Sequence, residues 1–322
     1  MTDTITPVGR LTAGTVTAVL HAAALAPSRH NTQPWRFRCT PDGIDVLADP
    51  VRSLPATDPG QRELLMSCGA ALFNLRVAIQ AHGIDPATTL CPRRDEPDLL
   101  ATVRPFAKRS VDTRIALLAG AIATRRTNRG EFSSRAVSAP ALNAMRSAAE
   151  SERAWMPQLD TTQLHRLREL VVTADRIQRE SAAVLRELNE WTGRAPTAVD
   201  GVPVLSTVNG SDAWLLHECG GSGPLGTPTV VVIGSVEDGQ PDRVRVGQAM
   251  QRVLLTATAA GLSVSFISQP VEVPSARAEL RQVLGGGIWP QIVLRVGYGG
   301  PVPSTPRRPL HDMIAGEQVR TG

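Results

Sequence analysis

The sequence predicts an α+β protein built from long helices and short strands. The chain has 322 residues, and at roughly 150 residues per domain this length suggests two domains. Apolar residues make up 42% of the chain and charged residues 20%, which is the balance of a protein that buries a large core. Stretches with helical spacing of apolar residues alternate with short apolar runs bounded by turn residues, so helices and strands are expected throughout.

The first elements are a helix and a hairpin. Alanine and leucine dominate residues 14–25, and Pro27 ends this helix because proline cannot continue the hydrogen-bond ladder. Two short apolar runs follow, at 35–39 and 44–48. The residues Pro41-Asp42-Gly43 between them are typical of a tight turn, so the two runs are predicted to be paired strands.

A long apolar helix is expected next. It covers residues 61–82 and ends at Gly83. Because it is apolar on more than one side, it is expected at the centre of the protein. Residues 91–105 are rich in proline and arginine, so the boundary between two halves is expected there, and a helix follows at 111–124.

The middle of the chain combines helices with a long irregular segment. A helix is expected at 139–150, a strand near Trp155, and one very long amphipathic helix at 161–191. Residues 193–227 are rich in Gly, Pro, Ser and Thr and show little periodicity. A segment of that length inside a compact domain is typically a lid or is disordered.

The last hundred residues have the clearest boundaries, including a glycine at position 261 that ends a helix. The helices at 64–83 and 246–261 both place small residues before aliphatic ones and end in glycine. This similarity between the two helices leaves open the interpretation that the chain contains a duplicated unit of roughly 100 to 200 residues. The expected elements are a strand at 229–234, a helix at 243–260, a strand at 263–268, a helix at 275–284 and a strand at 291–296.

Charge and cysteine usage exclude several classes of function. The 34 basic residues are nearly balanced by 30 acidic ones, so a nucleic-acid partner is not expected. The four cysteines form no CxxC pair, which indicates neither a zinc site nor a disulfide framework and fits the reducing cytoplasm. No apolar run reaches the length of a membrane span, and residues 16–26 are interpreted as a core helix instead of a signal peptide.

The most informative segment is Ala-Pro-Ser-Arg-His-Asn-Thr-Gln-Pro-Trp-Arg-Phe, residues 26–37. It places many hydrogen-bonding side chains between the end of a helix and a strand. They could satisfy local backbone groups in a turn, with Ser28 and Asn31 as the acceptors. They could equally bind a ligand, and the residues by themselves leave both interpretations open.

This segment resembles the flavin-contacting loop of FMN-dependent nitroreductases, which reads Pro-Ser, two variable residues, Asn, one variable residue, then Gln-Pro-Trp. Residues 125–129, Arg-Arg-Thr-Asn-Arg, resemble the Arg-rich opening of that family. Residues 294–310 resemble its closing strand and arginine-containing tail, and 246–261 resemble one of its helices. In an ordinary member the Arg-rich opening precedes the loop. Here it follows the loop, as in the tandem Acg-type branch.

The resemblance implies two nitroreductase-like halves in one chain, residues 1–110 and 111–322. They would form an intrachain pseudo-dimer around a mixed sheet with long central helices. It also implies FMN as the cofactor, with no acid, base or nucleophile required, because the flavin carries the redox chemistry. The implied FMN-binding residues are Ser28, Arg29, His30, Asn31, Thr32, Gln33, Arg125, Arg126, Thr127, Arg129, Ile267, Ser268, Gln269, Arg307 and Arg308.

The reaction that this resemblance implies is hydride transfer from NAD(P)H to flavin N5 and then to a nitroaromatic, quinone or similar acceptor. Each FMN site needs one loop and one set of arginines, and the chain has one of each, so one FMN per chain and a sufficient monomer are expected. The alternative is a protein that sequesters or stores FMN, or senses redox state, under a lid at 193–227 that blocks the nicotinamide.

Overall fold

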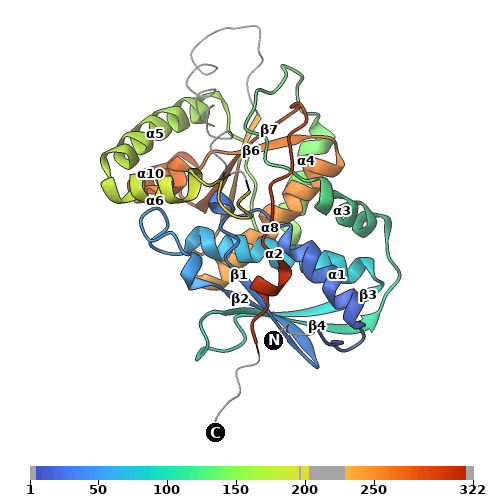
Figure 1. Cartoon of the computed structure of the whole chain (residues 1–322). Helices are drawn as coiled ribbons and strands as arrows, with labels where there is room; N and C mark the ends of the chain where they lie inside the picture. The colour runs from blue at the N-terminus through green and yellow to red at the C-terminus, as the bar shows by residue number, and fades with distance from the viewer. Residues whose placement is uncertain (1–4, 196, 203–228, 317–322) are drawn as a thin grey trace.

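The computed structural model describes residues 5–195, 197–202 and 229–316. Within them the α+β class is confirmed: helices surround two separate sheets (Figure 1). Instead of the one mixed sheet expected, there are two sheets whose strand ladders are antiparallel, and the parallel pairings at their edges are isolated bridges. The first sheet has the order β1-β2-β4-β3 and the second β5-β7-β6.

The expected elements are found in the expected order, with several boundaries shifted by one to three residues. The strands are β1 (Trp35–Thr40), β2 (Gly43–Ala48), β3 (Ile84–Leu90), β4 (Leu99–Lys108), β5 (Thr229–Ser235), β6 (Ser263–Phe266) and β7 (Trp289–Gly297). The helices are α1 (Ala13–Ala24), α2 (Arg62–Ala81), α3 (Thr113–Thr124), α4 (Ala139–Ser151), α5 (Thr161–Glu180), α6 (Ala182–Thr192), α8 (Gln240–Ala259), α9 (Gln269–Glu272) and α10 (Pro274–Val283). Short 3-10 turns lie at Arg29–Asn31, Pro50–Arg52 and Leu310–Met313.

Strands β3 and β4 occupy the region where the boundary between the halves was expected. Proline normally breaks a strand because it cannot donate to the ladder. Here Pro86 lies on the edge strand β3, opposite Pro105 and next to a bulge. Pro105 lies beyond the part of β4 that pairs with β2, which is Leu99 to Val103. Both prolines thus occupy positions that cost few ladder bonds, and this stretch completes the first sheet.

The second sheet is buried and is extended at both edges by isolated bridges. All but the first residue of β7, its central strand, are buried. Thr127 bridges Val264 of β6 in parallel, while Trp155 and Gln158 bridge β5. The strand expected near Trp155 is therefore only a pair of isolated bridges. The bridge at Thr127 brings the Arg-rich segment 125–129 to the edge of the sheet.

Helices α2 and α8 cross at the centre of the protein (Figure 1). The backbones approach so closely that a Cβ on Gly69 would lie 3.0 Å from the Cα of Gly247. Asp58 caps the start of α2, because its Oδ2 accepts the backbone N–H groups of Glu63 and Leu64, each at 2.9 Å. The predicted central position of this helix is confirmed.

By length and composition α2 is apolar enough to cross a membrane, and 83% of its apolar window is buried inside the protein. The expected cytoplasmic location and the expected absence of a membrane span stay predictions.

Among the described residues, no group of three or more His, Cys, Asp or Glu side chains could hold a metal ion.

The single helix expected at 161–191 is wrong, because Ser181 divides it into α5 and α6. Ser181 has extended backbone, with φ −91° and ψ 107°, and its side chain accepts the N–H of Val184 as a new N-cap. The apolar periodicity continues through the break, so the pattern alone does not reveal it. The break turns α6 toward the first half of the chain (Figure 1).

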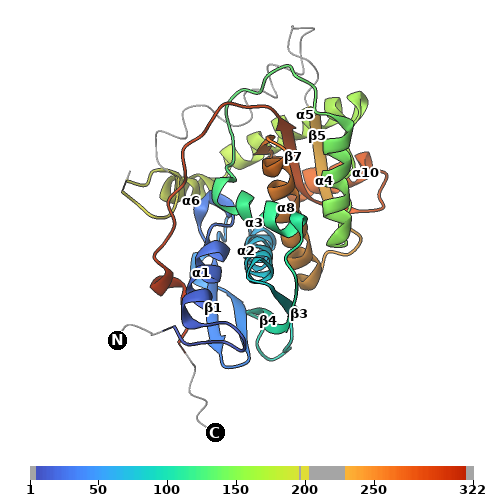
Figure 2. The same cartoon turned by 90° about the vertical axis from the view of Figure 1, so that its right-hand side faces the viewer.

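The segment after β7 runs back along the molecule to the first sheet (Figure 2). Ile314 bridges Phe37 of β1 in parallel, and the N–H of Ala315 donates to the Phe37 carbonyl at 2.8 Å. The C-terminal tail therefore ties the last strand of the chain to the first. On its way it passes the loop at 28–33.

Candidate functional site

A cavity of about 510 Å³ lies where the loop after α1, the Arg-rich segment and the end of β6 converge. Segments far apart in the sequence build it, from Pro27 to Val293. Its wall is partly apolar, with Met66, Met250 and Phe266, and partly charged. This combination suits a planar organic ligand that also carries polar groups.

Eight of the residues predicted for the site line this cavity together. Seven do not line it. The lining residues are Ser28, Arg29, His30, Thr127, Arg129, Ile267, Ser268 and Gln269. The predicted residues outside the lining are Asn31, Thr32, Gln33, Arg125, Arg126, Arg307 and Arg308.

The loop at 28–33 has an unusual backbone. His30, Asn31 and Gln33 have φ values of 44°, 55° and 51°, in the left-handed region that non-glycine residues rarely adopt. Ser28 stabilises the turn, because its hydroxyl accepts the N–H of Gln33 at 2.9 Å. Strained positions gathered in one loop are typical of ligand-binding sites.

Gln33 holds the loop to the rest of the protein. Its amide donates to the carbonyls of Asn31 and Val199 and accepts the backbone N–H of Arg308. The side chain is completely buried. Asn31 donates to the carbonyl of Pro306 at 3.2 Å. These side chains position the loop instead of lining the cavity.

The two tail arginines also act on this loop. Arg307 donates to the carbonyls of Ala24, Leu25 and Ala26 at the end of α1 and to the Asn31 side chain. Arg308 donates to the Gln33 carbonyl at 3.2 Å. A guanidinium at a helix C-terminus satisfies carbonyls that have no partner in the helix.

Arg125 is a buried cation with unpaired donors in its guanidinium. The side chain is 5% exposed, and its Nε and Nη1 are buried without a hydrogen-bond partner. Burial, Arg307 and Arg126 lower the pKa of Arg125 to about 9. Three guanidinium groups that repel one another in a buried place are stabilised by an anion, best by a dianion such as a phosphate ester.

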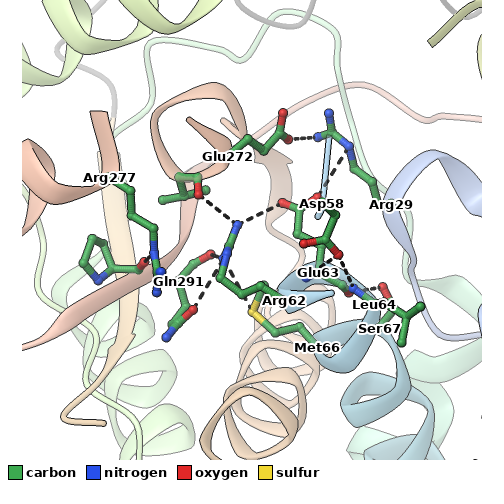
Figure 3. A network of polar contacts seen from close by, with 12 residues as sticks. Arg29, Asp58, Arg62, Glu63, Leu64, Met66, Ser67, Glu272, Arg277 and Gln291 are labelled. Carbon is green, nitrogen blue, oxygen red and sulfur yellow. Dashed lines mark hydrogen bonds and ion pairs between the residues drawn. The ribbon is translucent and has the colours of Figure 1, made fainter. Parts of the chain in front are cut away.

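A network of buried charges lies beside the cavity (Figure 3). Arg29 pairs with Glu272 of α9 and, at 3.5 Å, with Glu63 of α2. Arg62 donates to the carbonyls of Val271 and Gln291 and to Glu63. Burial and the nearby Glu63 raise the pKa of Glu272. The network ties the loop at 28–33 to α2 and α9.

Helices α5 and α6 close one side of the cavity. Sequence reasoning missed this side, because nothing in a helical pattern shows which distant loop a helix will cover. The same holds for Glu63, Met66 and Ser67 of α2. The lining residues of α5 and α6, here called the α5–α6 cover, are Asp175, Gln178, Arg179, Leu185, Leu188 and Thr192.

The α5–α6 cover is held to the first half of the chain by neighbouring residues of α6 and of the segment that follows it. Glu187, which is 7% exposed, accepts the N–H groups of Ala56 and Thr57 at 2.8 and 2.9 Å. Arg52 pairs with Asp200 and lies over the ring of Trp191, 5.4 Å from its centre. These contacts hold the cover over the loop at 28–33.

The segment predicted to be a lid is described only at its start. Residues 203–227 lie outside the described residues, as does residue 196. Within the described part, Val202 lines the cavity and the carbonyl of Val199 accepts from Gln33 at 2.9 Å. The beginning of the segment therefore lies against the predicted loop.

Comparisons with known proteins identify relatives along nearly the whole chain. The model of the Nitroreductase family matches residues 122–299. "Putative NAD(P)H nitroreductase Rv3131" of Mycobacterium tuberculosis is 34% identical, over 94% of this chain and 91% of its own length. "Putative NAD(P)H nitroreductase acg" of the same organism is 28% identical, over 94% of this chain and 96% of its own length.

Among solved structures, the FMN-dependent nitroreductase NfnB from Mycobacterium smegmatis in complex with NADPH is 18% identical, with a TM-score of 0.41. The match covers 63% of this chain and 100% of that one.

The family model covers more than half of the chain, and the similarity to Rv3131 extends over nearly all of it. The segments that carried the resemblance in the sequence, at 28–33, 125–129 and 267–269, meet around one cavity. The predicted family is thereby confirmed, and the chain belongs to the nitroreductase family.

Proposed function

We propose that this protein binds FMN in the cavity and is a flavin-dependent oxidoreductase. It would pass a hydride from NAD(P)H to a nitroaromatic, quinone or similar acceptor. The observation that carries the proposal is the buried guanidinium of Arg125, whose Nε and Nη1 have no hydrogen-bond partner. A buried cation without hydrogen-bond partners lowers the stability of the folded protein when no ligand is bound. The terminal phosphate of FMN would supply the missing negative charge and hydrogen-bond acceptors.

The donors around the cavity fit this cofactor. Arg125 and Arg126, which lie just outside the cavity lining, would hold the phosphate, and Arg307, whose donors are bound to the end of α1 and to the loop, would add its positive charge. Ser28 and Thr127 offer hydroxyl groups in the cavity wall. Backbone N–H groups of Ser268 and Gln269 would orient the ring edge, as the family resemblance implies, whereas the N–H of Ile267 already donates to the Val293 carbonyl at 2.9 Å. FMN, when bound, supplies the hydride chemistry. The residues of this chain bind it, orient it and exclude water through the α5–α6 cover.

We also propose that residues 1–110 and 111–322 are the two halves of an intrachain pseudo-dimer. Two observations support this. Each sheet packs against its own long helix, α2 or α8, and the two helices cross at Gly69 and Gly247. The loop comes from the first half, and the Arg-rich segment and tail come from the second.

The absorbance spectrum of the purified protein tests the proposal directly. A bound flavin is expected, and NADPH added without oxygen should bleach it. A colourless protein that also fails to take up added FMN would contradict the proposed function.

We expect one FMN per chain, because the chain has one loop of the Ser-Asn-Gln-Pro-Trp type and one Arg-rich segment. A second site would need a polar loop after α4, where residues 151–155, Ser-Glu-Arg-Ala-Trp, contain neither the asparagine nor the Gln-Pro pair, so too few donors would remain to offset the entropy of binding. Flavin released by heating and quantified against protein should approach one equivalent. A reproducible value of two, or a site shared between two chains, would refute the pseudo-dimer.

A second candidate function is the sequestration or storage of FMN, or redox sensing, with little turnover of NAD(P)H. The attachment of the α5–α6 cover by Glu187 and Arg52 favours it. A nicotinamide must stack on the flavin ring, and a closed cover would exclude it.

Replacing Glu187 with glutamine tests whether the cover limits access. The loss of a charged acceptor of hydrogen bonds is worth about 1.5 to 3 kcal/mol, so the open form should become about 10 to 100 times more populated. The rate of flavin reduction by NADPH, measured by anaerobic stopped flow, should rise accordingly.

The matched control is Glu190→Gln, because Glu190 is exposed on the same helix. It should leave the rate unchanged. Rapid reduction of the wild type, with no gain in Glu187→Gln, would refute sequestration under a closed cover and leave the oxidoreductase as the better description.

A further inference from the structure

His30 in the cavity wall accepts a hydrogen bond from its neighbour. The Nε–H of Arg29 donates to Nε2 of His30 at 3.1 Å. A guanidinium has only donors, so Nε2 must be an acceptor without a proton. The imidazole is then neutral, and its single proton lies on Nδ1. Position 30 is one of the two variable positions of the family motif, so the resemblance assigns no role to this side chain.

Arg29 is itself held in place by buried carboxylates (Figure 3). It pairs with Glu272, whose side chain is 1% exposed, and with Glu63, which is 12% exposed. Gln178 donates to the other oxygen of Glu272 at 2.6 Å. Groups on α2, α5 and α9 thus fix the guanidinium, and the guanidinium fixes the orientation of the imidazole.

The surroundings of His30 oppose a second proton on the ring. Burial, Arg29 and Arg129 hold the pKa of His30 well below its usual value. The other charged groups of the cavity wall are Glu63 of α2 and Asp175 and Arg179 of α5, and Asp175 and Arg179 pair with each other at 2.7 Å. The backbone of His30 is also strained, with φ 44° and ψ 25°, and such a conformation persists only where the surrounding structure imposes it.

We propose that His30 is a permanently neutral donor that offers its Nδ1–H to an acceptor atom of the ligand in the cavity. Arg29 is the positioning residue that selects this tautomer. The inference rests on the proposed function, because the ligand is taken to be a planar conjugated molecule with exposed oxygen or ring-nitrogen acceptors. A flavin ring and a nitroaromatic or quinone share this chemistry. A ligand that presents a donor to His30 would be rejected.

The tautomer is measured by NMR on protein with ¹⁵N-labelled histidine. The chain has six histidines, and the spectrum of His30→Asn identifies the His30 signals, since asparagine tolerates the left-handed backbone. Long-range ¹H–¹⁵N couplings should show Nδ1 protonated and Nε2 bare at pH 7. A ring protonated on Nε2, or a cation at pH 6, would overturn the proposal.

Arg29→Gln and Arg166→Gln separate the local effect from a general change of charge. Arg29→Gln should convert His30 to a mixture of tautomers. Arg166 carries the same charge but lies on the exposed face of α5, paired with Glu169 and Glu279, so its replacement should leave the His30 signals in place. An unchanged tautomer in Arg29→Gln would remove the positioning role.

Binding measurements then identify which ligand accepts the hydrogen bond. If it is FMN, His30→Asn should weaken FMN binding to the apoprotein roughly 2- to 10-fold. If it is the electron acceptor, FMN affinity should be unchanged and the KM for menadione should rise by a similar factor with little change in kcat. No change in either quantity would refute the proposal. A wild-type protein that binds no FMN would refute the proposed function. The NMR measurement would still test whether the His30 imidazole is neutral and protonated on Nδ1.

Discussion

Gly69→Ala and Gly247→Ala are expected to destabilise the protein by about 3 kcal/mol or more each, at the upper end of the cost of overpacking a core. A Cβ on Gly247 would lie 2.8 Å from the Cα of Met66 and collide with the Met66 carbonyl. A Cβ on Gly69 would meet the backbone of Val244 and Gly247 in the same way. Backbone atoms cannot yield by changing a rotamer, so α2 and α8 would have to separate.

Urea denaturation followed by circular dichroism measures this effect. The matched control is Gly120→Ala on α3, where an added Cβ would meet nothing within 4 Å. That variant should gain up to about 1 kcal/mol, because alanine forms helices better than glycine. If Gly69→Ala and Gly120→Ala had the same stability, the close crossing would be disproved.

The helix crossing also affects the cavity. Glu63, Met66 and Ser67 of α2 line it from one side and Met250 of α8 from another. Separation of the two helices would move these residues apart. We therefore expect any Gly69→Ala protein that still folds to bind FMN more weakly as well.

Arg125→Ala is expected to weaken FMN binding about 10- to 100-fold, since a charged hydrogen bond to phosphate is worth about 1.5 to 3 kcal/mol. The same change should leave the apoprotein as stable as the wild type or more stable. Removing a buried cation whose Nε and Nη1 have no partner relieves a desolvation cost. Affinity and apoprotein stability would therefore change in opposite directions.

Titration of the apoprotein with FMN and urea denaturation without FMN measure the two effects. Arg126→Ala is the comparison, because Arg126 is less buried and donates to the carbonyls of Ala123 and Arg125. Its loss should reduce FMN affinity less. Unchanged affinity in Arg125→Ala, or a clearly destabilised apoprotein, would show that Arg125 is a structural residue.

Arg308→Ala should also weaken FMN binding, but through a different cause. Arg308 holds Gln33 through its backbone N–H and its side chain. The alanine variant keeps the backbone bond and loses the side-chain bond to the Gln33 carbonyl, so it loosens the loop at 28–33 instead of removing a charge from the phosphate site. The sequence predicts the involvement of Arg308, and in the structure its side chain contacts the Gln33 carbonyl of the loop and also the Asp312 carbonyl and Asp49.

The sequence by itself determined the family and most of the elements. The motif at 28–35 combines a helix end, a polar loop and a strand start in a fixed order, and each part is a local property of the chain. Helix starts and ends are also local properties of the chain. Asp160 caps α5 together with Gln163, and Gly261, with φ 72°, follows the end of α8. Signals of this kind lie within a few residues of the feature they predict.

Only the tertiary structure decided the strands β3 and β4, the division of α5 from α6 and the cover over the cavity. Pro86 and Pro105 are tolerated because of the strands beside them, and Glu187 matters because of backbone groups 130 and 131 residues away. The burial of Arg125 leaves its Nε and Nη1 without a hydrogen-bond partner. Arg29 orients His30 because Glu272, which is distant in the sequence, holds the guanidinium in place. Burial and pairing depend on which segments meet in space, and no local pattern of residues contains that information.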